Sequence, residues 1–368
     1  MANKTVIAPK EIADWVTFKK NFEHPIHDWF YFKEGFSKEL VDWIMDVFGL
    51  KGPIYDPFCG CGTTLLAAKQ RNIVSYGLDI SPLAVLISKV KTRNYDVEKL
   101  RGSIAICKRE APSLEIQNKK IFKKYFSSEN IEDICMIKQN IKSIPDEKIR
   151  DFFMLALMDS ATKVALVKKQ GRSLRRIKRR PLPIRKIFFE KVEKMVGDLS
   201  NCTATGPEPK VIEGDARYFA LREKANAIIT SPPYLGKEEY AKVYKIELGL
   251  FLEQAPKLQT YFGEIREIPK TGKYEEMPIE AKAYFLDMEK AIEKMHESLE
   301  KGGLAFIVVA GGCLPNAVIE SDEIIEQIAE NAGFAKVDRI LARKVPCMRD
   351  RTKFVGKTRE SILVLEKW

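Results

Sequence analysis

A glycine-rich segment near residue 60 has the residue types of a nucleotide-binding turn. It reads Asp56-Pro57-Phe58-Cys59-Gly60-Cys61-Gly62-Thr63-Thr64 and lies between an apolar stretch and the start of a predicted helix. Glycines let the backbone approach a ligand closely, and free N–H groups at a helix start favour a carboxylate or phosphate. Asp79 ends the next predicted strand, where a carboxylate can accept hydrogen bonds from both hydroxyls of a ribose. Together these features favour a nucleotide-like ligand over an ordinary structural turn.

A second motif, Ser231-Pro232-Pro233-Tyr234, directly follows the apolar stretch 227–230. Two prolines end the strand and stiffen the turn. Alone, the motif would indicate only a strand that runs into a loop. It follows a strand of the same predicted sheet as the glycine-rich turn, and ligands of such sheets bind beyond the carboxyl ends of the strands. A catalytic role is therefore favoured.

Alternating strand and helix signals must position both motifs. We predict helices at 36–48, with Ser37 as its cap, and at 63–70, 82–90 and 278–299. Strands are predicted at 53–55, 73–78, 210–213, 227–230, 304–309, 337–345 and 361–365. This order predicts an α/β fold, with a doubly wound, mostly parallel sheet covered by helices on both faces.

The middle of the chain follows a different pattern. Residues 96–209 contain no convincing strand, and the segments 149–167 and 187–199 have apolar residues at helical spacing. We therefore predict a mainly helical insertion at 96–209. It separates a first half of the α/β domain, residues 1–95, from a second half, residues 210–368.

The charge of the chain is concentrated in that insertion. The 368 residues include 62 Lys and Arg against 51 Asp and Glu, a net charge of +11, and 45% are hydrophobic, which excludes wholesale disorder. Segment 163–186 holds 11 basic residues and no acid, so the rest of the chain is balanced. Such density predicts contact with a polyanion such as the DNA backbone. The candidate contacts are Lys169, Arg172, Arg175, Arg176, Lys178, Arg179 and Arg180.

The seven cysteines are scattered, which predicts reduced thiols and a cytoplasmic protein. No secretory signal is visible at the start, and the uncharged stretch 302–319 contains glycine pairs and Pro315-Asn316, so it predicts a buried strand and a turn rather than a membrane span. Cys59 and Cys61 lack the further ligands that a zinc site needs, so we expect no metal.

The two motifs together resemble those of the amino-methyltransferases that modify exocyclic amines of DNA bases. Members of that family carry a DPFxGxGTT-like cofactor loop and a [DNS]PPY turn, and this chain has DPFCGCGTT and SPPY. Blocks at 30–40, 76–79, 213–216 and 359–364 are also similar, so the resemblance covers about 21–95 and 210–368. It implies a seven-stranded, Rossmann-like methyltransferase sheet, interrupted here by the helical insertion.

The resemblance further implies S-adenosylmethionine as the cofactor, S-adenosylhomocysteine as its product and no metal. Carried over by motif, the cofactor-binding residues are Tyr31, Phe36, Asp56, Phe58, Gly60, Gly62, Thr63, Thr64, Asp79 and Asp215, and the catalytic residues are Ser231, Pro232, Pro233 and Tyr234. The target base must leave the duplex to be reached. Ser231 and the Pro232 carbonyl would then accept the hydrogens of its amine, while Tyr234 stacks on the base.

Ser at the first position of the turn is common in cytosine-N4 enzymes of that family, and we expect this target in double-stranded DNA. Adenine N6 and an exocyclic amine in RNA stay open as alternatives. A DNA-binding protein with an inactive methyltransferase fold and a nicotinamide dehydrogenase are disfavoured, because both motifs are intact and SPPY has no role in the latter. A separately encoded restriction endonuclease is a partner that this interpretation allows, and the insertion is the expected region of target recognition.

Overall fold

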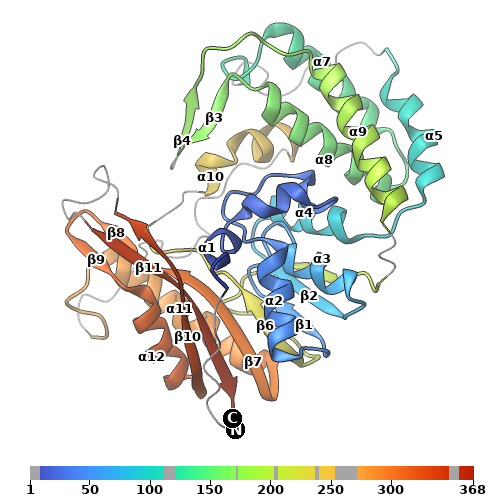
Figure 1. Ribbon diagram of the computed structural model, residues 1–368. Helices are drawn as coiled ribbons and strands as arrows, with labels where there is room; N and C mark the ends of the chain where they lie inside the picture. Colours follow the sequence, from blue (N-terminus) through green and yellow to red (C-terminus); the bar gives the residue numbers. More distant parts are fainter. Residues whose placement is uncertain are drawn as a thin grey trace.

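A computed structural model describes residues 9–110, 122–170, 173–202, 206–236, 240–252, 272–347 and 356–368 (Figure 1). Its centre is a seven-stranded sheet with the order β10-β11-β7-β6-β1-β2-β5. The strands are β1 (Ile54–Asp56), β2 (Ser75–Asp79), β5 (Lys210–Glu213), β6 (Ala225–Thr230), β7 (Leu299–Ala310), β10 (Phe334–Pro346) and β11 (Lys357–Lys367).

All neighbouring pairs from β5 to β7 are parallel, and only β11 runs antiparallel to its two neighbours, β7 and β10. The strand order reverses direction at β1, between β2 and β6, where a doubly wound sheet has its ligand crevice. The predicted doubly wound, mostly parallel sheet of seven strands is therefore confirmed. Each predicted strand is present, although β7 begins five residues before the predicted start at 304.

The two faces of the sheet are covered by different helices because side chains alternate along each strand. On one face, Ile54 and Phe306 pack with helix α2 (Lys38–Phe48). On the other, Tyr55 and Ile307 pack with α11 (Ile279–Ser298) and α12 (Ser321–Asn331), which Figure 1 shows on the opposite side from α2. The remaining elements at this end of the chain are α1 (Ile12–Trp15), η1 (Phe18–Glu23), η2 (His27–Trp29), α3 (Thr63–Gln70) and α4 (Pro82–Thr92).

The insertion forms a helical layer of its own. It contains α5 (Val97–Cys107), α7 (Ser128–Lys142), α8 (Glu147–Val164) and α9 (Ile184–Asn201). These helices share one hydrophobic core with α4 and with residues of a π-helical segment, η3 (Glu247–Phe251), which follows the short helix α10 (Tyr240–Val243). Residues from beyond position 209 thus complete the core of the helical layer.

Two predictions about local structure are wrong. The insertion does contain strands: β3 (Val167–Gln170) and β4 (Ser173–Arg176) form an antiparallel hairpin. Its basic residues lack the alternation of apolar side chains by which strands are recognised. Ser37 precedes α2 but does not cap it, because its hydroxyl oxygen accepts a hydrogen bond from the Lys20 N–H instead, while its proton is donated to the Thr17 carbonyl.

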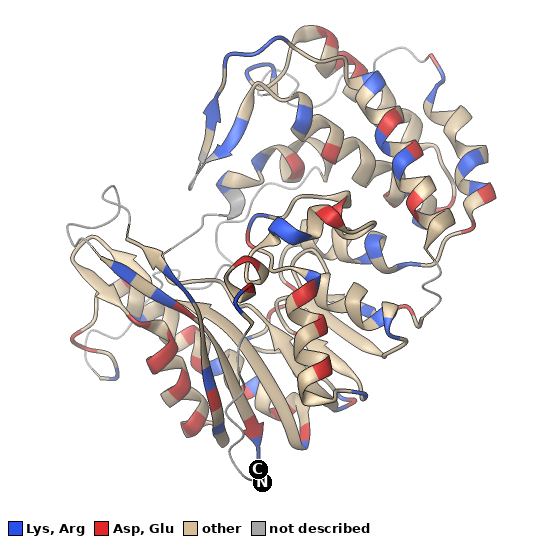
Figure 2. Ribbon diagram, in the orientation of Figure 1, with Lys and Arg blue, Asp and Glu red and all other residues tan. Residues whose placement is uncertain are grey.

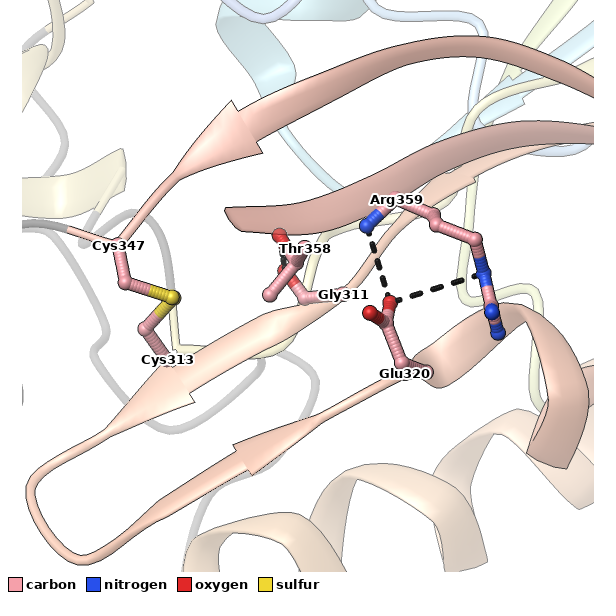
Figure 3. Close-up of a disulfide and its surroundings, with 6 residues drawn as sticks. All are labelled: Gly311, Cys313, Glu320, Cys347, Thr358 and Arg359. Atoms are coloured by element: carbon pink, nitrogen blue, oxygen red, sulfur yellow. Dashed lines mark hydrogen bonds and ion pairs between the residues drawn. A yellow bond between two sulfur atoms is a disulfide. The ribbon is translucent and has the colours of Figure 1, made fainter. Parts of the chain in front are cut away.

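A hairpin and a disulfide extend the end of the sheet (Figure 3). The hairpin consists of β8 (Gly312–Leu314) and β9 (Ala317–Ile319), which turn at the predicted Pro315-Asn316. Cys313 on β8 is disulfide-bonded to Cys347 at the end of β10, with 5.9 Å between the Cα atoms. The expectation that every thiol is reduced is therefore wrong for this pair, because the fold brings together two cysteines that lie 34 residues apart. Among the described residues, no helix is long and apolar enough to cross a membrane.

Candidate active site

A pocket of about 290 Å³ opens at the carboxyl ends of β1, β2, β5 and β6. Both motifs found in the sequence line it, together with residues of the N-terminal block. The lining includes Phe32, Phe36, Asp56, Phe58, Gly60, Thr63, Asp79, Asp215, Ser231, Pro232, Pro233, Tyr234, Arg343 and Glu360. The fold thus brings together residues that are more than 300 positions apart in the chain.

The glycine-rich turn needs glycine for its backbone. Gly60 has a φ of +50° and Gly62 a φ of +76°, both in the left-handed region that favours glycine. A Cβ on Gly62 would lie 2.9 Å from the Ser88 Oγ atom of α4. The Ser88 hydroxyl in turn donates to the Gly60 carbonyl over 2.9 Å. The turn is therefore held against α4 in one conformation.

Asp56 joins the turn to the strand that leads into SPPY. Its buried carboxylate accepts hydrogen bonds from the Thr230 hydroxyl over 2.6 Å and from the Phe58 N–H over 3.1 Å. Thr230 is the last residue of β6, directly before Ser231. Burial raises the pKa of Asp56 to about 7. The bond to Thr230 fixes the two turns relative to each other.

Asp79 ends β2 beside the glycine-rich turn. Its Oδ2 accepts a hydrogen bond from the Gly60 N–H over 2.9 Å, and its Oδ1 accepts one from the Ser81 N–H over 2.8 Å. Burial raises the pKa of this carboxyl group to about 6. Two backbone donors hold a carboxylate that keeps further acceptor capacity toward the pocket. As an acceptor, this carboxylate fits a ligand that presents a pair of hydroxyl donors, as a ribose does.

Asp215 follows β5, which pairs with β2, and it lines the pocket beside the end of the strand that carries Asp79. Its carboxylate pairs with Arg217, whose Nη2 lies 2.6 Å from Oδ2, and Arg217 also pairs with Asp287 of α11. Arg217 thereby fixes the orientation of Asp215. Reasoning from the sequence missed Arg217, although an arginine two residues after the aspartate was the available signal.

The SPPY turn is linked to the two C-terminal strands of the sheet. The Ser231 hydroxyl donates to the Tyr234 hydroxyl over 3.3 Å, and the latter donates to Oε1 of Glu360 on β11 over 2.8 Å. Arg343 on β10 pairs with Oε2 of the same carboxylate. Sequence reasoning missed both Arg343 and the contact of Glu360, and no local pattern signals them because Glu360 lies 126 positions from Tyr234.

Three of the predicted cofactor residues do not line the pocket. Tyr31 is 42% exposed, and its ring packs against those of Phe18 and Phe22. Gly62 and Thr64 support the turn from behind: Gly62 precedes α3, and the buried Thr64 hydroxyl donates to the Ile229 carbonyl.

The predicted DNA contacts lie on the β3–β4 hairpin and the segment after it, which Figure 2 shows as a run of basic residues at the edge of the helical layer. Five of these residues, on the hairpin and the segment after it, have exposed side chains: Arg175, Arg176, Lys178, Arg179 and Arg180. Arg172 lies outside the described residues. This surface is separate from the pocket lining.

Two of the predicted contacts have structural partners instead. Lys169 is largely buried, pairs with Glu247 over 2.6 Å and lies 3.8 Å above the Tyr244 ring. Arg179 is exposed but donates to the Ala165 carbonyl at the end of α8 over 2.7 Å. Because the ammonium group of Lys169 is largely buried, a phosphate at the surface cannot reach it. Across the part of the chain that is described, no group of three or more His, Cys, Asp and Glu side chains could hold a metal ion.

Comparison with known proteins points to one class. No family model matches the chain. It is 22% identical to the Type II methyltransferase M.MvaI of Kocuria varians, over 86% of this chain and 84% of that protein. It is 27% identical to the Type II methyltransferase M.BsoBI of Geobacillus stearothermophilus, over 64% of this chain and 54% of that one.

A shorter match, 46% identical over 54 residues, involves the Type II methyltransferase M.MjaII of Methanocaldococcus jannaschii and covers 15% of this chain and 10% of that protein.

Among solved structures, a TehB-like SAM-dependent methyltransferase of Corynebacterium glutamicum aligns with a TM-score of 0.34 at 12% identity, over 89% of this chain and 86% of that one. Over most of its length, the chain is thus similar to Type II methyltransferases.

Proposed function

We propose that this protein is a DNA methyltransferase that transfers the methyl group of S-adenosylmethionine to the exocyclic amine of a base. The observation that carries the proposal is that one pocket joins the glycine-rich turn, Asp79 and Asp215 to the Ser231–Tyr234 turn. The curated relatives are all named as Type II methyltransferases, which supports the same reaction class.

Within this proposal, the part of the pocket that is lined by the glycine-rich turn, Asp79 and Asp215 holds the cofactor. Asp79 accepts the hydrogen bonds of the ribose hydroxyls, and Asp215, oriented by Arg217, lies where it can contact the adenine. Phe36, Phe58 and Gly60 line the same pocket. S-adenosylmethionine supplies a methyl group on a positively charged sulfur, and S-adenosylhomocysteine is the product.

The part of the pocket that is lined by the Ser231–Tyr234 turn holds the target amine. Its nitrogen is a poor nucleophile because its lone pair is delocalised into the base. The oxygen atoms of the Ser231 hydroxyl and the Pro232 carbonyl accept hydrogen bonds from its two N–H groups, which localises the lone pair and directs it toward the cofactor. The nitrogen then bonds to the methyl carbon as the methyl–sulfur bond breaks, S-adenosylhomocysteine leaves, and the methylated nitrogen releases one proton to water. Tyr234 provides an aromatic face for a base that has left the duplex. Most of the catalysis then comes from positioning.

We propose cytosine N4 as the methylated atom. The support is Ser231 itself, since serine at this position is common in cytosine-N4 enzymes of the family that the motifs resemble. Adenine N6 is the alternative outcome that the test must distinguish.

We further propose that residues 96–209 recognise the DNA, while 1–95 and 210–368 carry out the chemistry. The exposed Arg175, Arg176, Lys178 and Arg180 contact the phosphate backbone in this proposal. Their density on one hairpin is what supports it. A cytoplasmic location and a separately encoded restriction endonuclease are compatible with this function.

The proposal is tested by incubating the protein with S-adenosylmethionine labelled on its methyl group and with duplex DNA, tRNA or rRNA. We expect label in the DNA alone, and a loss of at least tenfold in rate for Ser231→Ala. Label in RNA alone would instead support the RNA alternative. No incorporation, together with no binding of S-adenosylmethionine in calorimetry, would reject the methyltransferase function.

A further inference from the structure

A chain of polar contacts connects the floor of the pocket to the edge of the sheet. It runs from the Ser231 hydroxyl to the Tyr234 hydroxyl over 3.3 Å and from there to Oε1 of Glu360 over 2.8 Å. Arg343 pairs with the other oxygen, Oε2. All four side chains line the pocket, and they come from the SPPY turn, β11 and β10. The notion that Tyr234 only stacks on a base leaves this chain unexplained.

The carboxylate at its end fixes the direction of every hydrogen bond in the chain. Ionised Glu360 can only accept, so the Tyr234 hydroxyl must donate to it. The Tyr234 oxygen then offers a lone pair, and the Ser231 hydroxyl donates its proton there. A serine hydroxyl can otherwise donate or accept, whereas carboxylate and carbonyl oxygens accept by their nature. Because its proton is already donated to Tyr234, the Ser231 hydroxyl can only accept a hydrogen bond from a group in the pocket.

Burial and charge keep the chain in this state. The Glu360 side chain is only 2% exposed, and the charge of Arg343 compensates its carboxylate through the ion pair. Burial, with a smaller contribution from the charge of Glu360, raises the pKa of Tyr234 well above its usual range. The Tyr234 hydroxyl therefore stays protonated and remains a donor at neutral pH.

We propose that Glu360 and the Tyr234 hydroxyl are positioning groups that hold Ser231 as a hydrogen-bond acceptor for the target amine. This inference rests on the proposed function, since it assigns a reason for the reactivity of the same turn. Arg343 acts one step further away by pairing with the other carboxylate oxygen of Glu360. A hydroxyl that donated into the pocket would instead compete for the lone pair of the amine and slow the transfer.

Tyr234→Phe is the variant that separates this role from stacking, because it keeps the ring and removes only the hydroxyl. We expect a 10- to 100-fold lower kcat on duplex DNA, with an unchanged KM for DNA and an unchanged Kd for S-adenosylmethionine. Tyr218→Phe is the matched control, since the Tyr218 side chain is 68% exposed and outside the pocket lining. A kcat for Tyr234→Phe within twofold of the wild type would overturn the inference.

Glu360→Gln and the double variant Tyr234→Phe/Glu360→Gln complete the test. Because both groups act through Ser231, we expect the double variant to be no more than about twofold slower than the slower single variant. Effects that multiply would mean that the groups act separately, which also overturns the inference. A wild-type protein that methylates DNA while the variants keep full rate rejects this inference alone. A wild-type protein that methylates no DNA rejects the proposed function and the inference with it.

Discussion

Two aspartates at strand ends, the buried Asp56 and the partly buried Asp79, line the pocket. Each ends a strand of the parallel sheet and accepts backbone hydrogen bonds from the residues that follow it. Burial raises the pKa of Asp56 to about 7 and that of Asp79 to about 6, so the surroundings of both carboxyl groups disfavour the charged form. A ligand that donates hydrogen bonds to Asp79 offsets this cost, which explains why a carboxylate is retained there.

Asp79→Asn tests this role because the amide keeps the shape of the side chain and replaces one acceptor oxygen with a donor. Hydrogen bonds to charged groups contribute roughly 1.5–3 kcal/mol, so we expect the Kd for S-adenosylmethionine to rise roughly 10- to 100-fold in calorimetry. Glu300→Gln, at an exposed position of β7, is the control and should bind as the wild type does. Unchanged binding by Asp79→Asn would exclude Asp79 from the cofactor site.

The raised pKa of Asp56 also makes stability depend on pH. Between the usual pKa of 3.8 and the folded value of about 7, the folded protein binds a proton that the unfolded chain does not. Asp56 therefore contributes a free energy of unfolding that is fully present below pH 3.8 and lost as pH rises through 7. We expect Asp56→Asn to flatten the fall in stability between pH 5 and pH 8 in urea titrations. An identical pH dependence in the variant would contradict the assigned pKa.

Among the elements, the β3–β4 hairpin combines two antiparallel strands with exposed basic side chains, as expected of a ribbon that binds DNA. Its strands carry exposed arginines on a short antiparallel pair, whereas Lys169 of the same hairpin points into the core and pairs with Glu247. Val167, Leu174 and Lys169 therefore anchor the hairpin to the helical layer, while Lys168, Arg175 and Arg176 are exposed. This arrangement limits the DNA surface to the exposed part.

Neutralising Arg176, Lys178 and Arg180 to Gln should weaken DNA binding and make it less dependent on salt. Each lost phosphate contact lowers the slope of log K against log salt by about 0.9. The control replaces Lys51, Lys210 and Lys301, three exposed lysines at the amino ends of strands, opposite the pocket. Fluorescence anisotropy at several salt concentrations checks both sets. Equal slopes for the two triple variants would place the DNA elsewhere.

The disulfide between β8 and β10 makes a simple chemical prediction. Five of the seven cysteines are free, so the protein, denatured without reductant, should expose five thiols to a thiol reagent. Reductant should raise the number to seven, and Cys313→Ser should release Cys347, leaving six without reductant. Seven thiols without reductant would show that the two cysteines are not bonded in the isolated protein, in agreement with the expectation from the sequence.

Over the whole molecule, the parts that sequence reasoning predicted are those with a local cause. Strand ends, the glycine turn and α3 follow from apolar runs, glycines and prolines within a few residues, and the structure has them at or near the predicted positions. The β3–β4 hairpin and the Cys313–Cys347 bond depend on pairings that no local pattern encodes. The contact of Glu360 with Tyr234 joins residues 126 positions apart, and only the arrangement of the strands in the folded sheet reveals it.

The overall charge shows the same division. The net charge of +11 equals that of segment 163–186, so the sheet and its pocket belong to a balanced body and the excess lies in the insertion. In the proposed enzyme, the insertion would attract and hold DNA, while the neutral body would carry the reaction. DNA that is bound by the insertion would have to present its target base to the pocket at the carboxyl ends of β1, β2, β5 and β6, where the methyl group is transferred.

The most direct test of this account is nucleoside analysis, by mass spectrometry, of duplex DNA treated with the protein and S-adenosylmethionine. We predict N4-methyldeoxycytidine as the product, at a yield that falls at least tenfold with Ser231→Ala and stays unchanged with the surface control Glu300→Gln. N6-methyldeoxyadenosine as the only product would contradict the cytosine assignment. The absence of any methylated nucleoside would contradict the account as a whole.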